Sequence, residues 1–280
     1  MSTAKKLDKF YTKSHIAFEC YDIFKEYVGN DILIIEPSAG DGAFLKVIDN
    51  PKIGFDLLPE SDNIIQNDFL NDNHIKNIKE SFVILGNPPF GNKSRLAIEF
   101  LNKSLDICDT VGFIIPIQFR KWSVQKNIKK TAKLLLDHDL PEDAFLFNGK
   151  PYKVRCCFQI WSNNGNNDER IKLIPDVNHF DFSMYQYNCT EPALKFFDYD
   201  WDFAVPRQGF LDYKRKVFSK DELTTHQQWI FFKARNKKVL DRLLTIDFEM
   251  LSKKNIGIPG FGKADVVTEY DKLFDIDFLQ

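Results

Sequence analysis

The sequence predicts an α/β fold: a mostly parallel sheet with helices on both faces, an antiparallel edge and a smaller C-terminal region. Three observations lead to this prediction. Short apolar runs alternate with helix-length segments through the first 162 residues, which is typical of parallel sheets built from strand–helix–strand units. The runs are bounded by turn residues, as buried strands are. The 280 residues suffice for one large domain, or for a domain with a small appendage.

The elements of this sheet can be assigned in chain order. Four apolar runs are expected to form buried strands, namely DILII (31–35), KIGF (52–55), FVIL (82–85) and VGFIIP (111–116). Two segments have helical length and spacing, 95–107 and 119–136. Two later runs, 145–147 and 154–161, are expected to pair with each other around Gly149 and Pro151 and to form the antiparallel edge.

A change in composition divides the chain. The segment SNNGNNDER (162–170) has no hydrophobic residue and is rich in Asn and Gly. It predicts a linker, although a long hairpin tip would have the same composition. We therefore expect one domain over 1–165 and a second region over 166–280. Within the second region only 227–244 has the spacing of a helix.

The charge distribution bears on the class of partner. A formal net charge of −2 argues against a protein that coats nucleic acid indiscriminately. Residues 110–136 nevertheless contain six Lys and Arg and no acidic residue, and 207–242 contains ten Lys and Arg against four acidic residues. Such stretches are usually solvated faces, but they are also the composition that contacts a phosphate backbone.

Cysteine usage and hydropathy bear on compartment. The five cysteines form no CxxC pair and have no neighbouring His at ligand spacing, so we expect reduced thiols and no metal site. No apolar run reaches membrane-spanning length, and MSTAKKLDKF has no signal-peptide core. The expected location is therefore cytoplasmic, with no membrane partner.

The segment IIEPSAGDGAFL (34–45) has the form of a ligand-binding turn. A buried strand runs into a turn that contains Gly40 and Gly42, and a helix is expected to follow. Glycines let a ligand approach the backbone closely. The spacing is neither GxGxxG nor a phosphate loop that ends in GK[ST]. A purely structural strand–helix turn would also explain this segment taken alone.

Two acidic residues follow the next runs. Asp56 ends KIGF, where a carboxylate can accept hydrogen bonds from both hydroxyls of a ribose. Asp68 lies in QNDFL beside Phe69, which offers an aromatic face. Either Asp alone would be a turn or cap residue. Because both come after successive strands of one sheet, they predict a nucleoside-shaped site.

The tetrapeptide Asn87-Pro88-Pro89-Phe90 follows the strand FVILG directly. Two prolines fix the backbone and remove two donors, so nearby carbonyls are left as acceptors. The Asn87 amide oxygen and the Pro88 carbonyl could then receive both N–H bonds of an aromatic amine, with Phe90 stacked on its ring. A rigid turn with a core Phe would explain the tetrapeptide alone, but not its place beside the glycine turn.

The ordered set of motifs resembles the N6-adenine class of DNA amino-methyltransferases, in the arrangement whose cofactor motifs precede the catalytic one. EPSAGDGAF resembles the cofactor turn of that family, GFDLLP its ribose acid, NDFL its adenine-contacting acid and NPPF its catalytic tetrapeptide. FYTKSHIAFECYDIF (10–24) resembles the N-terminal segment that caps the methionine end of the cofactor. FNGKPYKVRCCFQIW (147–161) resembles the strand pair that adds an aromatic residue to the base pocket. The likeness covers about residues 10–162.

The resemblance implies a Rossmann-like methyltransferase sheet that binds S-adenosylmethionine. The residues that it assigns to the cofactor are Tyr11, Thr12 and Lys13 near the methionine moiety, Glu36, Pro37, Gly40 and Gly42 as the wall, Asp56 at the ribose, and Asp68 and Phe69 at the adenine. Those that it assigns to catalysis and to the target base are Asn87, Pro88, Pro89 and Phe90. Phe147 or Tyr152 would complete the base pocket.

Both basic stretches are expected to serve the substrate. Loops at the carboxyl ends of parallel strands border the ligand crevice, which predicts that Arg120, Lys121 and Trp122, after VGFIIP, lie near the target base and its flanking phosphates. Lys214, Arg215 and Lys216 lie outside the matched half and are candidates for holding the backbone elsewhere. Region 166–280 would then be a substrate-recognition domain.

The predicted reaction is methyl transfer from S-adenosylmethionine to the N6 amine of a flipped-out adenine in DNA. An RNA adenine methyltransferase is the nearest alternative, and FYTK and EPSAGDGAF favour DNA. A non-catalytic nucleic-acid-binding or assembly protein with the same fold is a second alternative, which intact Gly40, Asp56, Asn87 and Pro88 disfavour. A restriction endonuclease is the expected kind of protein partner.

Overall fold

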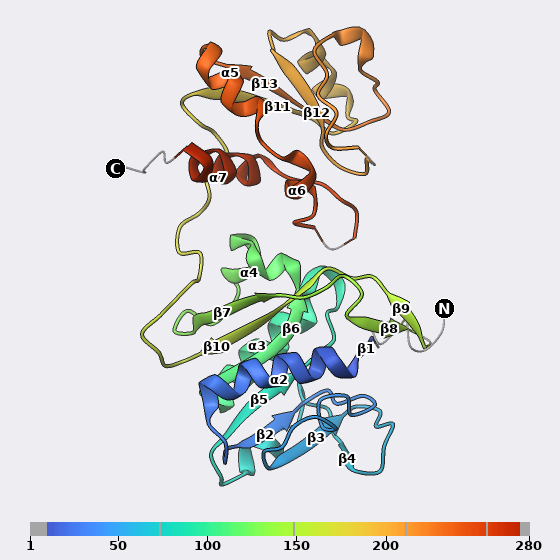
Figure 1. The fold of residues 1–280 in the computed structure, drawn as a ribbon, viewed down its shortest axis with the longest axis vertical. Helices are drawn as coiled ribbons and strands as arrows, with labels where there is room; N and C mark the ends of the chain where they lie inside the picture. Colours follow the sequence, from blue (N-terminus) through green and yellow to red (C-terminus); the bar gives the residue numbers. More distant parts are fainter. Residues whose placement is uncertain (1–9, 73, 148, 211, 256, 275–280) are drawn as a thin grey trace. The chain divides into compact units, whose positions relative to one another are not determined.

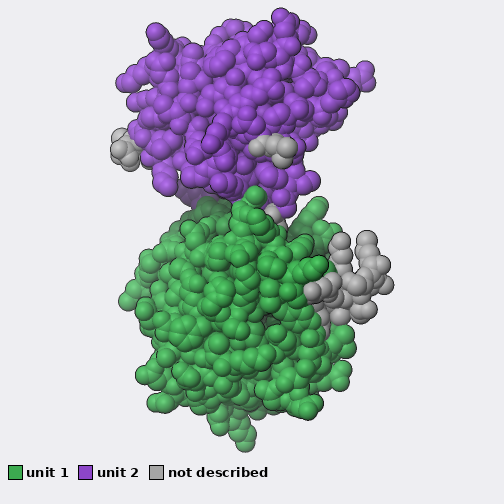
Figure 2. Space-filling view, turned by 45° about the vertical axis from the view of Figure 1, so that its right-hand side comes forward, with its two compact units in different colours: residues 1–172 green, residues 173–280 purple. Residues whose placement is uncertain are grey.

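A computed structural model describes residues 10–72, 74–147, 149–210, 212–255 and 257–274. The chain forms two compact units, residues 1–172 and 173–280 (Figure 2). No helix in the described ranges is long and apolar enough to cross a membrane.

Unit 1 is built on a seven-stranded sheet of order β4-β3-β2-β5-β6-β10-β7 (Figure 1). Its strands are β2 (Leu33–Glu36), β3 (Lys52–Asp56), β4 (Ile64–Gln66), β5 (Phe82–Gly86), β6 (Thr110–Pro116), β7 (Lys133–Asp139) and β10 (Cys156–Ser162). The first five in spatial order are parallel, and β10 is antiparallel to both β6 and β7. The prediction of a mixed α/β fold with a mostly parallel sheet is confirmed.

Two helices cover opposite faces of this sheet. On the neighbouring residues Gly112 and Phe113 of β6, side-chain positions point to opposite faces. A Cβ at Gly112 would lie 2.7 Å from Phe24 of α2 (Ser14–Val28). Phe113 instead packs in one cluster with Leu101 of α3 (Arg95–Ile107). The helix predicted over 95–107 is therefore present with the same bounds.

The antiparallel edge differs from the prediction. β8 (Phe145–Phe147) does not pair with 154–161; it pairs with β9 (Lys150–Tyr152) and β1 (Tyr11–Thr12) in a separate small sheet. The edge of the main sheet is β10 and β7. Phe147 pairs with Lys150 and Phe145 with Tyr152, so the residues just after Gly149, whose φ is 72°, take the pairing edge of β8 that 154–161 was expected to occupy.

The helix predicted over 119–136 is wrong. The segment holds a 3-10 turn (Ile117–Arg120), the short helix α4 (Trp122–Gln125) and the beginning of β7. Lys133 therefore lies on a strand and not on a solvated helix face. Residues 133–139 pair with β10 at the edge of the main sheet, and this tertiary pairing outweighs the local helical spacing.

The predicted linker packs against unit 1. The Arg170 guanidinium donates hydrogen bonds to four backbone carbonyls, those of Gln125, Ile128 (2.8 Å), Lys129 (2.9 Å) and Ala132 (3.2 Å). The amide of Glu169 donates to the Leu134 carbonyl at 2.8 Å. The polar segment thus satisfies the acceptors of the irregular region before β7, and the compact unit extends to residue 172.

Unit 2 has a three-stranded antiparallel sheet of order β11-β13-β12, formed by β11 (Phe182–Tyr187), β12 (Phe203–Pro206) and β13 (Trp229–Ala234). Its helices are α5 (Lys237–Leu244), α6 (Phe248–Ser252) and α7 (Lys263–Phe274), with 3-10 turns at Glu191–Asp198 and Lys220–Glu222. In unit 1 the remaining 3-10 turns are His74–Asn77 and Asn92–Ser94.

The helix predicted over 227–244 is correct only in its second half. Alternate residues of β13 enter two different clusters, Ile230 and Phe232 in one and Trp229 and Phe231 in the other, so this strand is buried on both faces. The helix begins after Asn236, whose side chain accepts a hydrogen bond from the Val239 amide at 3.0 Å. A fully apolar run before a cap residue has no periodicity that separates strand from helix.

Candidate functional site

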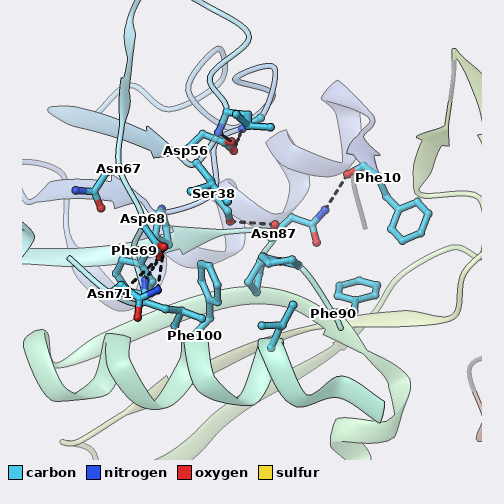
Figure 3. Close-up of a pocket in the computed structure, with 18 of the residues that line it drawn as sticks. Phe10, Ser38, Asp56, Asn67, Asp68, Phe69, Asn71, Asn87, Phe90 and Phe100 are labelled. Carbon is cyan, nitrogen blue, oxygen red and sulfur yellow. Dashed lines mark hydrogen bonds between the residues drawn. The ribbon is translucent and has the colours of Figure 1, made fainter. Parts of the chain in front are cut away.

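A cavity of about 340 Å³ lies in unit 1 where the turns after β2, β3, β4 and β5 meet the N-terminal segment and the beginning of α3 (Figure 3). β3 and β5 lie on opposite sides of β2 in the sheet. Such a switch point in strand order opens a crevice at the carboxyl ends of the strands. The predicted residues that line it are Tyr11, Pro37, Gly40, Asp56, Asp68, Phe69, Asn87, Pro88, Pro89 and Phe90.

The other predicted residues do not line the cavity. Those of unit 1 that are not on the cavity wall are Thr12, Lys13, Glu36, Gly42, Arg120, Lys121, Trp122, Phe147 and Tyr152. Lys214, Arg215 and Lys216 belong to unit 2. The sequence missed several lining residues, among them Phe10, Ser38, Asn67 and Asn71.

The turn after β2 is tied to Asp56 at the end of β3. The Gly40 amide donates to Asp56 Oδ2 and the Leu58 amide to Asp56 Oδ1, both at 2.8 Å. Gly40 has a φ of 52°, in the left-handed region that favours glycine. Each carboxylate oxygen keeps a further lone pair. Asp56 therefore offers the cavity a rigidly held acceptor that is itself 8% exposed.

Tyr11 links the N-terminal strand to the loop after β3. Its hydroxyl donates to Glu60 Oε1 at 2.7 Å, and its ring lies 4.0 Å from the position of a Cβ on Gly40. Burial, reinforced by the Glu60 carboxylate, raises the pKa of Tyr11 to about 12. The hydroxyl is consequently a donor throughout the physiological pH range.

Glu36 lies behind the wall. It ends β2, is 2% exposed, and its Oε2 has no hydrogen-bond partner among the described residues. Burial, with the nearby Asp41 and Asp56 carboxylates, raises the pKa of Glu36 well above its ordinary value. A Cβ on Gly86 would lie 3.1 Å from Glu36 Cγ, so the Glu36 side chain packs directly against the Gly86 position of the neighbouring strand β5.

The Asp68 carboxylate organises the loop after β4. It accepts from the amides of Leu70 and Asn71, each at 3.2 Å, and from the Asn71 side chain at 2.9 Å. The bond from Asn71 is the largest cause of its lowered pKa. Lys103 of α3 donates to the Leu70 carbonyl at 3.0 Å. Phe69 is buried against Phe100, with ring centroids 5.0 Å apart, so it is at once core and cavity wall.

Asn87 is held at three points. Its carbonyl accepts from Ser38 Oγ at 3.2 Å. Its side-chain nitrogen donates to the Phe10 carbonyl at 3.3 Å and to Thr12 Oγ1 at 3.2 Å. Its side-chain oxygen Oδ1 is buried and has no partner among the described residues. In Figure 3 the oxygen end of this amide faces the side of the site where Phe90 lies.

An aromatic cluster adjoins Phe90. Phe10 stacks on Tyr152, with centroids 4.9 Å apart and planes at 9°, and it lies 6.0 Å from Phe147 and 6.3 Å from Phe90. Phe145 meets Phe90 edge-on at 6.2 Å. Phe147 and Tyr152 therefore pack against Phe10, which lines the cavity, and do not line it themselves. Phe10 belongs to the segment that the sequence singled out, but its side chain was not assigned.

Several of the predicted basic residues already contact groups within their own unit. The Arg120 guanidinium donates hydrogen bonds of 2.8 to 3.0 Å to the Asp137 carboxylate and one of 2.6 Å to the Asp139 carboxylate. In unit 2, Lys214 pairs with Glu249 at 3.2 Å. Arg215 donates to the Glu222 carbonyl and Lys216 lies over the Phe248 ring at 5.7 Å. Within the described ranges no cluster of His, Cys, Asp or Glu could hold a metal ion.

No protein-family model and no curated protein sequence matches the chain. Among solved structures, a proposed RNA methyltransferase of Pyrococcus horikoshii is similar at 15% identity, over 56% of this chain and 87% of that one, with a TM-score of 0.45. A proposed class I S-adenosylmethionine-dependent methyltransferase of Listeria monocytogenes is similar at 14% identity, over 59% of this chain and 64% of that one, with a TM-score of 0.44. The modification subunit of a proposed type I restriction enzyme of Vibrio vulnificus is similar at 15% identity, over 78% of this chain and 51% of that one, with a TM-score of 0.42. At these identities the likeness concerns the fold alone.

Proposed function

We propose that the chain transfers a methyl group from S-adenosylmethionine to the N6 amine of an adenine in DNA. The observation that carries this proposal is the Asn87 amide. Its oxygen is a buried acceptor without a partner in the described chain, and Asn87 lies on the wall of the cavity. A buried acceptor left unpaired costs about 1–3 kcal/mol, so the site favours a ligand that brings an N–H donor.

The cavity suits a nucleoside cofactor. Asp56 presents a fixed carboxylate for ribose hydroxyls, and Leu57, Leu58 and Phe69 supply apolar surface for a base. Gly40 leaves the backbone open to close approach. We propose that these residues, with Asp68 at the adenine, hold S-adenosylmethionine. When bound, this cofactor supplies an electrophilic methyl group on a sulfonium.

The target amine is a weak nucleophile because its lone pair is delocalised into the ring. In the proposed mechanism Asn87 Oδ1 and the Pro88 carbonyl each accept one N–H bond of the amine. The nitrogen is then favoured as a pyramidal nucleophile, and the positive charge that develops on it is stabilised. Phe90 stacks on the ring. No strong base is required, since the proton can leave to water after transfer.

Two motifs of the sequence bear on whether the substrate is DNA or RNA. FYTK before the turn and EPSAGDGAF within it resemble DNA-modifying enzymes, which favours DNA. The solved structures of similar fold include a proposed RNA methyltransferase and the modification subunit of a proposed restriction enzyme. An RNA substrate is therefore the second candidate. A restriction endonuclease partner belongs to the same proposal as DNA.

The test is methylation of DNA and RNA in parallel with labelled cofactor, followed by nucleoside analysis. We expect label in N6-methyladenine from DNA. Asn87→Ala should lower kcat about 10²- to 10³-fold, the range for removing one transition-state hydrogen bond, with cofactor affinity unchanged. Asn63→Ala, an exposed amide outside the cavity, is the control. Label only in RNA would replace the substrate, and no label in either polymer would reject the function.

A further inference from the structure

We propose that Thr12 is a positioning residue for Asn87. Its hydroxyl, together with the Phe10 carbonyl, determines which end of the Asn87 amide faces the cavity. The resemblance to the methyltransferase family places Thr12 at the cofactor, so this is a different role. The inference rests on the function proposed above for the same site.

The orientation of the amide follows from chemistry. The two ends of a carboxamide have almost the same shape, so rotation by half a turn about χ2 exchanges a donor for an acceptor. The Phe10 carbonyl can only accept, and therefore the atom 3.3 Å from it must be the Asn87 nitrogen. Thr12 Oγ1 accepts the second N–H at 3.2 Å. With both hydrogens of the nitrogen engaged, the oxygen is the end left for a ligand.

Thr12 acts on Asn87 and not on the ligand directly. It is 7% exposed and is not on the wall of the cavity, whereas its neighbours Phe10 and Tyr11 are. Its backbone is fixed by pairing with Phe145 of β8. A β-branched side chain has few χ1 choices on such a strand. The hydroxyl is consequently presented to Asn87 from one direction.

The strand that carries Thr12 is anchored on both sides. Tyr11 bonds to Glu60 at 2.7 Å, and Lys13 pairs with Asp143 at 2.7 Å. Loss of the Thr12 acceptor would leave one buried N–H of Asn87 unpaired and weaken the preference for this orientation. In the reverse orientation the amide would turn an N–H toward an incoming amine, donor against donor. Turnover would fall in proportion to the share of correctly turned amide.

The kinetic test uses Thr12→Val, which keeps the shape of the side chain and removes the acceptor. We expect kcat to fall about two- to tenfold, because the Phe10 carbonyl still favours the productive orientation, with little change in cofactor affinity. Thr12→Ser, which retains the hydroxyl, should recover most of the turnover. Thr110→Val removes a hydroxyl that contacts Ser162 Oγ at 3.2 Å, away from the cavity, and is the matched control. Should Thr12→Val not fold, Thr12→Ala takes its place.

A second measurement is independent of activity. In ¹⁵N-asparagine-labelled protein, the side-chain amide of Asn87 is identified by its loss in Asn87→Ala. Its hydrogens should exchange slowly with solvent in the parent and in Thr12→Ser, and faster in Thr12→Val. Unchanged exchange and unchanged kcat in Thr12→Val would overturn the inference while Asn87→Ala still supports the reaction. Loss of cofactor affinity alone would also overturn it. If the parent methylates no polymer, the proposed function fails and amide exchange alone decides the role of Thr12.

Discussion

Glu36 is a buried carboxyl group of unit 1 whose ionisation opposes folding. Its side chain is buried at the end of β2, and its pKa is raised by burial and by two nearby carboxylates. A carboxyl group with a raised pKa favours folding in its protonated form. Its contribution is fully present below the unfolded pKa, about 4.3, and is lost as the pH rises through the higher folded pKa.

The variant Glu36→Gln mimics the protonated form at every pH. We expect it to match the parent in acid and to be more stable than the parent above neutral pH, with the difference growing as the pH rises. Denaturant unfolding of the full chain, followed at several pH values through the transition of unit 1, measures this. Glu26→Gln, on the exposed side of α2, should show no such trend. A parent and a Glu36 variant with parallel pH profiles would contradict the expectation.

At the scale of single residues, the sequence predicts the site in part. Asp56, Asn87 and Phe90 can be brought together because they end or closely follow recognisable strands, and parallel strands end at one edge. Asp68 follows the short strand β4 and lines the same cavity. The hydrogen bonds that join these turns to one another cannot be predicted from the sequence in the same way. Ser38 to Asn87, and Asn87 to the N-terminal strand, join segments whose register depends on the whole fold. Their roles in binding stay predictions.

At the scale of elements, the predicted strands are correct where a short buried apolar run is bounded by turn residues on both sides. The buried runs that became β2, β3, β5 and β6 are short and bounded by turns, and the parallel sheet follows from them. The predictions failed where local spacing and tertiary pairing disagreed. Residues 133–139 became a strand because β10 enters the sheet between β6 and β7, a placement set by contacts distant in sequence. β4, with three residues, is too short for a periodic signal.

The β8–β9 hairpin presents an exposed aromatic ring, that of Tyr152. Tyr152 stacks on Phe10 and is 38% exposed, so its ring is accessible beside the cavity wall. Tyr152→Ala should weaken polynucleotide binding by about 1–3 kcal/mol, the range for one base–aromatic stack, and should leave cofactor affinity unchanged. Phe18→Ala on α2, where the ring is 56% exposed, is the matched control. Equal binding by Tyr152→Ala and Phe18→Ala would remove the hairpin from the base pocket.

For the whole molecule, the question is what unit 2 contributes. Lys214, Arg215 and Lys216 contact acidic, carbonyl and aromatic groups in this unit, yet the Lys214 side chain is 79% exposed. Each phosphate contact lowers the slope of log affinity against log salt by about 0.9 on duplex DNA. The triple change of these residues to Ala should therefore flatten that slope, with cofactor affinity unaltered.

The control for this experiment removes the same charge elsewhere in unit 2. Arg235, Lys237 and Lys238 are exposed and lie before or at the beginning of α5. Salt titrations of the parent and of both triple variants, with one duplex, give three slopes to compare. A slope for the Lys214–Lys216 variant equal to that of the parent would mean that this run is only surface.

The pairing of β1 with β8 imposes an order of assembly during synthesis. Lys13 and Asp143, which flank this pairing, are 130 positions apart in sequence. A ribosome adds about 5–20 residues per second, so the first strand waits roughly ten seconds for its partner. Closing so long a loop also costs entropy that later contacts must offset. A nascent chain that ends before residue 145 therefore already carries the turns around Asp56 and Asn87, but it lacks the strand partner that fixes Thr12 beside them.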